Sequence, residues 1–409
     1  MSEWQTTTLG AICEAGGGSI QTGPFGSQLH AEEYSATGVP VVMPQDIGEN
    51  LISLDRIARV PDDIASRLER HRLVPGDIVF SRRGDVTRRA LVRDSNSDWL
   101  CGTGCLRVRP GGEADSRFLS YLLGTTDARD WLLGNAVGTN MLNLNTAILG
   151  RLPLTLPPLR EQKAIAEVLG ALDDKIAANT ALIERADELM HLTFRSLTTA
   201  LEVPLSSAAE FVNGRAFTKG ASGTGRVVVR IAELNGGISG STVFSDAIVD
   251  DKHVAQPGDI LFAWSGSLTL HRWFRDEAIV NQHIFKVIPA GGYPTWLVYE
   301  MLRQKLADFK AIAADKATTM GHIQRHHLDE LVAVPEEETV RRLDPLMTAL
   351  WSAALAAERE SLSLAATRDA LLPQLMSGKL RVRDAENVAS VTPSTITSKV
   401  GDSNELHLH

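Results

Sequence analysis

The stretch LPPLREQKAIAEVLGALDDKIAANTALIERADELM (156–190) decides how the chain is organised. Its prolines end a strand-like run, and a strongly helical segment then continues to about residue 199. Large globular-looking segments precede and follow it. A helix of this length between two domains is longer than either domain needs for its own core.

Apolar residues in this segment recur at alternating steps of four and three, the pattern of a coiled-coil seam. Asn179 occupies one seam position, where a buried amide can fix the register at some cost in stability. A second helical segment, from 336 to about 377, is less regular and has two apolar stripes. The alternative is a large helical domain unrelated to this spacing. The predicted seam residues are Ile165, Leu169, Leu172, Ile176, Asn179, Ile183, Met190, Leu350, Leu364 and Leu371.

The chain contains an internal repeat. LVPGDIVFSRRGDVTRRALVRD (73–94) matches AQPGDILFAWSGSLTLHRWFRD (255–276), with the Pro-Gly-Asp-Ile turns beginning at Pro75 and Pro257. GTNMLNLNTAILGRLPLTLPP (138–158) matches ATTMGHIQRHHLDELVAVPEE (317–337), with Met141 aligned on Met320. Segments 138–158 and 317–337 each lead into a long helical segment. The chain therefore has the order globule, helix, globule, helix, which predicts an internal duplication.

The predicted fold is therefore α+β, with two similar globular domains that contain mixed sheets. Two long helices separate the domains and are expected to form an antiparallel coiled coil with pseudo-twofold symmetry. Such a chain suits a target with dyad symmetry, and duplex DNA is the obvious one. The predicted parts are domain 1 (1–157), the central helix (158–202), domain 2 (203–335), the C-terminal helix (336–380) and a flexible tail (381–409).

Composition describes an ordinary globular protein with a formal net charge of −9. Three cysteines (Cys13, Cys101 and Cys105) are sparse and odd in number, which favours a reducing cytoplasm over a disulfide framework. No apolar run reaches the length of a membrane span, and the N-terminus has no secretory pattern. The acidic balance argues against nucleic acid, but all basic residues of domain 1 are arginines, which suit phosphate and guanine.

Four segments carry a resemblance to a known family: IQTGPFGSQLHAEEYSATGVPVVMPQDI (20–47), PGDIVFSRRG (75–84), NMLNLNTAILGRLPLTLPPLREQKAIAEVLGALDDKI (140–176) and RDALLPQLMSGKLRV (368–382). The chain resembles the specificity subunit of type I restriction–modification enzymes to about residue 383. The most specific pieces are the Pro-Pro-Leu-x-Glu-Gln start of the first helix and the Leu-Leu-Pro-x-Leu-x-x-Gly end of the second. PEEETVRRLDPLM (335–347) departs from the family's Glu-Gln start.

The resemblance implies that each globule is a target recognition domain reading half of a split DNA sequence. It implies that the helices dock two methyltransferase subunits, which bind S-adenosylmethionine and methylate adenine N6. Translocase–nuclease subunits would complete the restriction enzyme. The specificity subunit itself would have no catalytic residues and no cofactor.

Local motifs leave several interpretations open. GPFGSQ (23–28) is either a tight turn or a loop whose N–H groups approach a DNA phosphate. CGTGC (101–105) favours buried thiols over zinc, because no second ligand pair accompanies it. GHIQRHH (321–327) favours a helix start or a DNA-facing loop over a metal site. The Asn/Asp-Pro-Pro-Tyr tetrapeptide expected of an adenine methyltransferase is not found.

DNA contacts are expected from three kinds of segment. SRRGDVTRR (81–89) places two arginine pairs around a Gly-Asp turn, and both pairs would project near the tip of a hairpin; an ordinary solvated turn is the alternative. Its counterpart AWSGSLTLHRWFR (263–275) carries different side chains, as expected if each domain reads a different half-site. Residues just before each long helix complete the set. The candidates are Gly23, Gly26, Ser27, Gln28, Arg82, Arg83, Arg88, Arg89, Thr139, Asn140, Trp264, Ser265, Ser267, His271, Arg272, Thr319, Gln324 and Arg325.

Two other classes of protein remain open at this stage. A stand-alone methyltransferase would have to act without the tetrapeptide noted above and without a recognisable cofactor loop. A coiled-coil scaffold would use its globules to bind proteins rather than DNA.

Overall fold

The computed structural model describes residues 4–138, 141–315 and 321–382. No helix within these ranges is long and apolar enough to cross a membrane. The chain divides into two compact units. Unit 1 takes the residues up to Asp174 together with those from Ala365 on, and unit 2 is Lys175–Leu364. The predicted tail lies almost entirely outside the described residues, and the predicted domain boundaries stay predictions.

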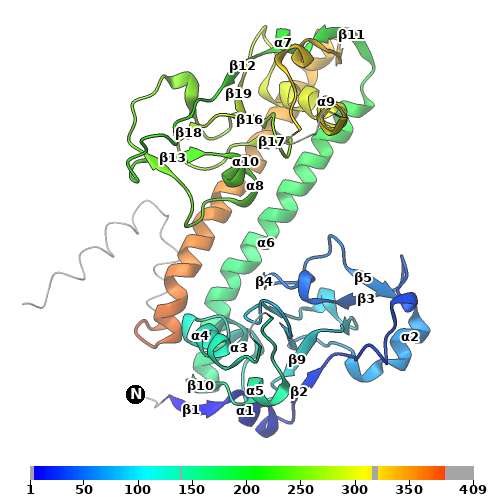
Figure 1. The fold of residues 1–409 in the computed structure, drawn as a ribbon, viewed down its shortest axis with the longest axis vertical. Helices are drawn as coiled ribbons and strands as arrows, with labels where there is room; N and C mark the ends of the chain where they lie inside the picture. The colour runs from blue at the N-terminus through cyan, green and yellow to red at the C-terminus, as the bar shows by residue number, and fades with distance from the viewer. Residues whose placement is uncertain (1–3, 139–140, 316–320, 383–409) are drawn as a thin grey trace, which may run out of the picture. The chain divides into compact units, whose positions relative to one another are not determined.

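Unit 1 is built on a five-stranded sheet with a smaller three-stranded sheet beside it (Figure 1). The strands of the larger sheet, in order, are β2 (Ser19–Thr22), β9 (Cys105–Arg109), β6 (Ile78–Ser81), β7 (Arg89–Leu91) and β4 (Glu49–Asn50). The smaller sheet has the order β5 (Ala58–Val60), β3 (Val39–Val42), β8 (Leu100–Cys101), and β1 (Gln5–Thr8) pairs with β10 (Pro153–Leu156). All four residues of β6 are buried, because this central strand is covered on both faces. The helices are α1 (Leu9–Ala15), α2 (Asp62–Arg67), α3 (Ser116–Leu122), α4 (Thr126–Asn135) and α5 (Thr146–Gly150).

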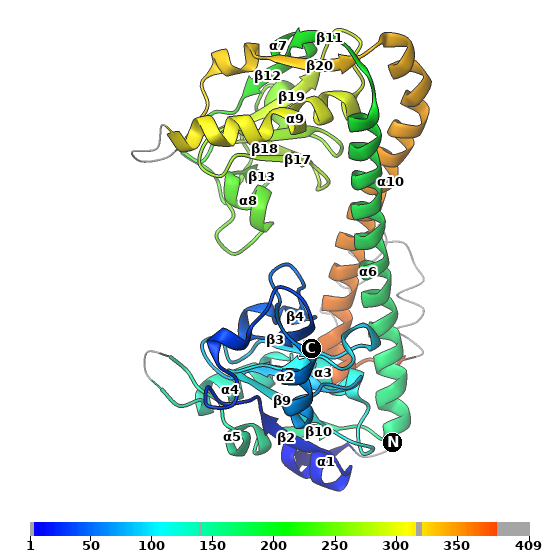
Figure 2. The same cartoon turned by 90° about the vertical axis from the view of Figure 1, so that its right-hand side faces the viewer.

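Unit 2 repeats this plan with two four-stranded sheets. The first has the order β12 (Ala209–Asn213), β19 (Ile284–Pro289), β16 (Ile260–Ala263), β17 (Thr269–Arg272). The second has the order β14 (Phe244–Ser245), β13 (Arg226–Val229), β18 (Ala278–Val280), β15 (Val254–Ala255), and β11 (Thr199–Pro204) pairs with β20 (Leu331–Pro335). The helices are α7 (Leu205–Ala208), α8 (Ile231–Gly236) and α9 (Thr295–Asp315). Helix α9 lies beside the strands of unit 2 in Figure 2. Its Trp296, Met301 and Phe309 belong to the hydrophobic core around the first sheet.

The two units share strand order as well as strand number. In the first sheet given for each unit, β2-β9-β6-β7 corresponds to β12-β19-β16-β17, with every one of these neighbouring pairs antiparallel. In the second sheets, each unit has one parallel pair, β3 with β8 and β13 with β18. The predicted duplication and the α+β class are therefore confirmed.

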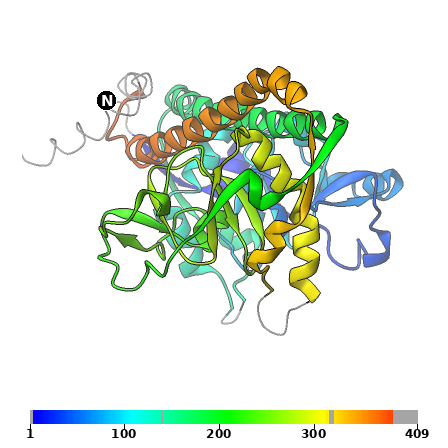
Figure 3. The same ribbon diagram turned by 90° about the horizontal axis from the view of Figure 1, so that it is seen from above.

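The two predicted long helices are α6 (Leu159–Ser196) and α10 (Glu337–Met376), which lie side by side in Figures 1 and 3. None of the predicted seam residues is exposed: each is buried or half-buried. Within unit 2, Met190 near the end of α6 and Met347 near the start of α10 belong to the same buried cluster, so the pair is antiparallel as expected. Asn179, 2% exposed, donates to the Glu360 carboxylate (2.8 Å) and the Ala357 carbonyl (3.4 Å), which makes the seam specific at this level.

In unit 1, the start of α6 is locked to the globular domain by the Gln162 side chain. Its Oε1 accepts from the Asp115 backbone N–H (3.0 Å), and its Nε2 donates to the Pro157 carbonyl (2.8 Å). Asp115 in turn caps α3 through Phe118 N–H. Further along α6, Tyr121 donates to Asp173 and Arg117 pairs with Asp174, both at 2.5 Å. The glutamine of the Pro-Pro-Leu-x-Glu-Gln motif therefore has a structural reason to be where it is.

His71 gives unit 1 a pH-dependent stability. The ring is 2% exposed, and its Nε2 accepts from Arg70 Nε (3.0 Å). Burial first, and then the charges of Arg70 and Arg107, lower its pKa from 6.5 to about 4. Between these pH values the unfolded chain binds a proton that the folded chain refuses, so stability falls as pH falls from 6.5 to about 4, by about 3 kcal/mol in all.

His71→Gln is expected to remove this slope, because glutamine does not titrate. Urea unfolding midpoints of unit 1, measured at several pH values across that window, check the expectation. Equal pH slopes for the variant and the parent protein would contradict it.

Candidate nucleic-acid interface

Backbone hydrogen bonds bring four loops of unit 1 together: 23–28, 82–88, 102–104 and 137–144, of which 139–140 lie outside the described residues. We call this set loop cluster 1. Gly84 N–H donates to the Leu142 carbonyl (3.1 Å), and Leu144 N–H donates to the Arg82 carbonyl (2.9 Å). Arg82 N–H donates to the Gly104 carbonyl (2.8 Å), and the Arg82 guanidinium lies 5.8 Å from the centroid of the Phe25 ring. Residues predicted from separate motifs therefore share one surface.

Unit 2 builds loop cluster 2 from residues 214–217, 264–268, 281–283 and 321–325. Gly266 N–H donates to the Gly321 carbonyl (2.8 Å), and Ile323 N–H donates to the Trp264 carbonyl (3.1 Å). Trp264 N–H donates to the His283 carbonyl (3.1 Å). These three bonds reproduce the three of loop cluster 1.

The equivalence holds residue by residue. Arg82 and Gly84 correspond to Trp264 and Gly266, with the same offset in numbering as Pro75 and Pro257. Leu142, Leu144 and Gly104 correspond to Gly321, Ile323 and His283, with the same offset as Met141 and Met320. These are the two offsets that the sequence repeat predicts. The frame is the same in both units, and only the side chains that it carries differ.

The GPFGSQ loop is a built turn. Gly23 is buried, its N–H donates to the Cys105 carbonyl (3.0 Å), and a Cβ there would lie 2.0 Å from the Gly102 oxygen. Gln28 Oε1 accepts from Phe25 N–H (3.1 Å), which closes the turn, while Gly26 and Ser27 are exposed. The amide of Gly23 is thus used internally, which favours the tight-turn interpretation; contact of Gly26, Ser27 or Gln28 with DNA stays a prediction.

The four arginines do not all project from the hairpin tip, as the sequence suggested. Arg83 is exposed and Arg82 half-buried, and Arg88 donates to the Pro44 carbonyl (3.2 Å). The expectation is wrong for Arg89, whose side chain is 3% exposed in β7 and bonds to the Ser120 carbonyl (2.6 Å) and Glu49 (3.0 Å). Burial lowers the pKa of Arg89, and Glu49 opposes that shift.

The candidate DNA-contact residues of unit 2 also include both exposed and buried side chains. Trp264 is partly exposed and its Nε1 donates to Asn213 Oδ1 (2.9 Å). Asn235 contacts both Ser267 (3.0 Å) and His271 (3.1 Å), which ties these two candidates to α8. Burial lowers the pKa of His271. Ser265 is buried, whereas Gln324 and Arg325 are exposed.

Arg272 does not belong to loop cluster 2. Its side chain is 4% exposed and pairs with Asp187 of α6 (3.1 Å) and Glu358 of α10 (2.9 Å), beneath the Trp351 ring at 4.7 Å. We therefore leave it out of the proposed interface. Three further candidates, Thr139, Asn140 and Thr319, lie outside the described residues.

Sequence reasoning missed exposed apolar residues in loop cluster 1. Phe25, Val137 and Met141 are 52%, 64% and 62% exposed. An aromatic ring at the tip of a closed turn, under an arginine, can contact bases as well as phosphates. The only sequence signal for Phe25 was its position between the two glycines of GPFGSQ.

The remaining motifs have structural roles. Cys101 and Cys105 are buried, as predicted; burial raises the pKa of Cys101 to about 12 and that of Cys105 well above its ordinary value. His327 is buried and its Nδ1 accepts from Gln324 N–H (2.9 Å) at the start of a 3-10 helix (Arg325–Asp329). Within the described ranges, no three His, Cys, Asp or Glu side chains are grouped to hold a metal ion.

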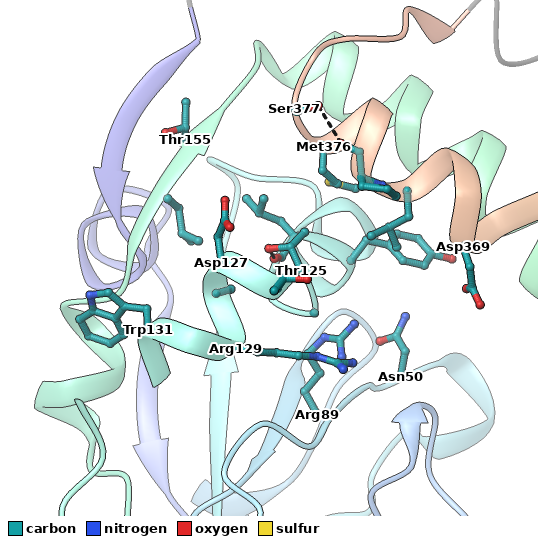
Figure 4. A pocket seen from close by; sticks show the side chains of 18 of the residues that line it. Asn50, Arg89, Thr125, Asp127, Arg129, Trp131, Thr155, Asp369, Met376 and Ser377 are labelled. Atoms are coloured by element: carbon teal, nitrogen blue, oxygen red, sulfur yellow. Dashed lines mark hydrogen bonds between the residues drawn. The ribbon is translucent and has the colours of Figure 1, made fainter. Parts of the chain in front are cut away.

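Unit 1 also has a cavity of about 980 Å³ beside α4 and the last turns of α10 (Figure 4). Asn50, Arg89 and Arg129 lie on one side of it and Asp369 on another. Its cations are paired: Arg89 and Arg129 with Glu49 (3.0 and 2.6 Å), and Arg368 with Asp173 (2.8 Å). The cavity therefore offers little net positive charge to an anionic ligand.

The fold and the two loop clusters define a class of protein: two related α+β domains that present different side chains on the same backbone frame, with long antiparallel helices. Comparison with known proteins shows what this chain is similar to. Residues 1–188 match the type I restriction modification DNA specificity domain. The chain as a whole is similar to the specificity subunits of type I restriction–modification enzymes, as the sequence motifs indicated.

The individual relatives are distant. The putative MjaX specificity subunit of Methanocaldococcus jannaschii is 28% identical over 154 residues, which cover 36% of each chain. The MjaIX specificity subunit of the same organism is 22% identical over 427 aligned positions, covering 93% of this chain and 94% of that one. A solved type I restriction–modification S subunit from M. genitalium has the same fold, with a TM-score of 0.59, 17% identity, and coverage of 91% of this chain and 96% of that one.

Proposed function

We propose that this chain is the non-catalytic DNA-recognition subunit of a type I restriction–modification complex, and that it reads a bipartite DNA target. The observation that carries the proposal is the pair of loop clusters with one backbone frame and different side chains. A duplicated frame with unlike side chains suits a target whose two half-sites differ in sequence. Its distant relatives named as specificity subunits support the same function.

The proposed division of labour follows from the chemistry of the target. Adenine N6 lies inside the duplex, so a methyltransferase has to extrude the base before it can react. The two recognition domains would hold DNA on both sides of the extruded bases. Two methyltransferase subunits, which would carry S-adenosylmethionine, would dock on α6 and α10. Translocase–nuclease subunits would add restriction activity.

The deciding experiment is deletion of this chain in its host, followed by genome-wide mapping of N6-methyladenine. We expect one split motif to vanish, and to return when the chain is restored. Persistence of every methylated motif, with the partner subunits still expressed, would overturn the proposed function.

Arg83 is expected to contribute one phosphate contact, since it is the exposed arginine of loop cluster 1. Arg83→Ala should weaken binding of the methyltransferase complex to all duplexes alike. It should also reduce the slope of log K against log salt by about 1. Fluorescence anisotropy at several salt concentrations measures both effects.

Arg151→Ala is the matched control, because Arg151 is exposed at the end of α5 and lies outside both loop clusters and both long helices. Its binding slope should equal that of the parent complex. A sequence-selective loss at Arg83, with no change of slope, would instead assign it to base contact.

A further inference from the structure

The turn Asn281–His283 of loop cluster 2 stands where loop cluster 1 has Gly102–Gly104. Asn281 N–H donates to the Val229 carbonyl (3.1 Å) just as Gly102 N–H donates to the Val42 carbonyl (2.9 Å). In each unit a glycine of the first loop is pressed against this turn. A Cβ at Gly214 would lie 2.0 Å from the Asn281 oxygen, as a Cβ at Gly23 would from the Gly102 oxygen.

The two turns have the same backbone but different side chains. Gly104 has φ +85°, and His283 at the equivalent position has φ +72°. Left-handed backbone is natural for glycine and strained for a residue with a Cβ. The other described non-glycine residues with positive φ are Asn50 and Asp98, whose short polar side chains tolerate it well. Unit 2 therefore carries an imidazole where glycine would suit the backbone better.

The strained side chain lies within the candidate interface. The His283 ring is 5.2 Å from the Trp264 ring, centroid to centroid, and Trp264 is itself held by Asn213. His283 Nδ1 is buried without a hydrogen-bond partner among the described residues. The neighbouring Gln282 is exposed, and its backbone N–H is fixed by the Arg215 carbonyl (3.0 Å).

We infer that the Asn281–His283 turn is a specificity determinant of unit 2, in which Gln282 and His283 hydrogen-bond to base edges. The inference rests on the proposed function and adds the residues that read one half-site. A carboxamide matches the N6 and N7 edge of adenine, and an imidazole N–H donates to the N7 or O6 acceptors of guanine. Strain that is kept at a position where glycine would remove it points to a role in binding.

The central variant is His283→Gly, tested in the complete methyltransferase complex. Glycine relieves the strained backbone, so the midpoint of thermal unfolding should stay the same or rise. Discrimination at one half-site should nevertheless fall by about tenfold or more, as expected for one lost base contact. The other half-site should keep its selectivity. The selectivity at each half-site is measured by mapping methylated adenine on a plasmid library with randomised half-sites.

Gln282→Ala tests the second residue without altering the strained position, and it should relax the same half-site. Asp98→Gly is the matched control. Asp98 is exposed in unit 1 with φ +64° and lies outside both loop clusters, so its replacement also puts glycine at a left-handed backbone position. It should leave both half-sites unchanged.

An unchanged motif for both His283→Gly and Gln282→Ala would overturn the inference while leaving the proposed function intact. A His283→Gly protein that unfolds more easily and loses both half-sites equally would also overturn it, because that result assigns His283 a structural role. If the parent complex methylates no split sequence at all, the proposed function itself fails, and that outcome is distinct from the other two.

Discussion

Arg272→Met is expected to destabilise unit 2 by about 3–5 kcal/mol, the usual effect of removing one partner from a buried ion cluster. The guanidinium bridges Asp187 and Glu358, whose side chains are 32% and 15% exposed. Without it, two carboxylates face each other in a site that water enters poorly. The contact with the Trp351 ring is lost as well. Denaturant unfolding, followed by hydrogen exchange in peptides of α9, measures the effect on unit 2.

The loss of unfolding free energy in Arg272→Met should depend on pH in a defined direction. Burial raises the pKa of Glu358 above its ordinary value even though Arg272 opposes that shift. Removing Arg272 raises this pKa further, so the folded variant binds a proton more readily than its unfolded chain does. Stability of the variant should therefore recover as pH falls below the raised folded pKa of Glu358 toward the ordinary value of 4.5, and should be lost again as pH rises through the folded pKa.

Two variants make this prediction sharp. Arg272→Met/Glu358→Leu replaces the pair with apolar groups and should recover most of the loss, since Asp187 is the more exposed carboxylate. Arg341→Met removes an arginine that also pairs with two glutamates, at 2.8 and 2.5 Å, but is 66% exposed, and it should cost less than about 1 kcal/mol. Equal effects of Arg272→Met and Arg341→Met would show that burial does not govern the strength of these pairs.

Arg272 and Arg89 also show where sequence reasoning reaches its limit. Both lie in strand-like runs next to turns, where an arginine ordinarily reads as exposed and free to bind DNA. Their partners are far away in sequence: Asp187 and Glu358 stand 85 and 86 residues from Arg272, and Glu49 stands 40 residues from Arg89. Local pattern carries no information about such pairs, so the sequence could not separate these two buried arginines from the exposed Arg83.

The long helices and the duplication were predictable because their signals are local or periodic. The heptad spacing around Asn179 and the two repeat offsets each follow from sequence alone. The offset that aligns Met141 with Met320 also aligns Gly-Thr-Gly at 102–104 with Asn281, Gln282 and His283. That alignment was within reach of sequence analysis; what sequence could not supply was the left-handed backbone that makes His283 unusual.

Gly23→Ala is expected to destabilise unit 1 by about 3 kcal/mol, the upper end of the range for overpacking. The added Cβ would lie 2.0 Å from the Gly102 oxygen and 3.1 Å from the Cys101 oxygen. Both are backbone atoms next to β8 and β9, so no flexible side chain can move aside. Relief requires the first loop to separate from the 102–104 turn, and that movement would also break the hydrogen bond from Gly23 N–H to Cys105.

Gly26→Ala is the control from the same GPFGSQ loop. Nothing lies within 4 Å of a Cβ at Gly26, and its φ is outside the left-handed region. Stability should stay within about 1 kcal/mol of the parent, or rise slightly because alanine restricts the unfolded chain. Hydrogen exchange in peptides covering β2 and β9 separates the variants: Gly23→Ala should accelerate it and Gly26→Ala should not. Equal exchange in both would mean that the close approach of the two loops does not hold loop cluster 1 together, and the shared frame on which both recognition surfaces depend would lose its physical basis.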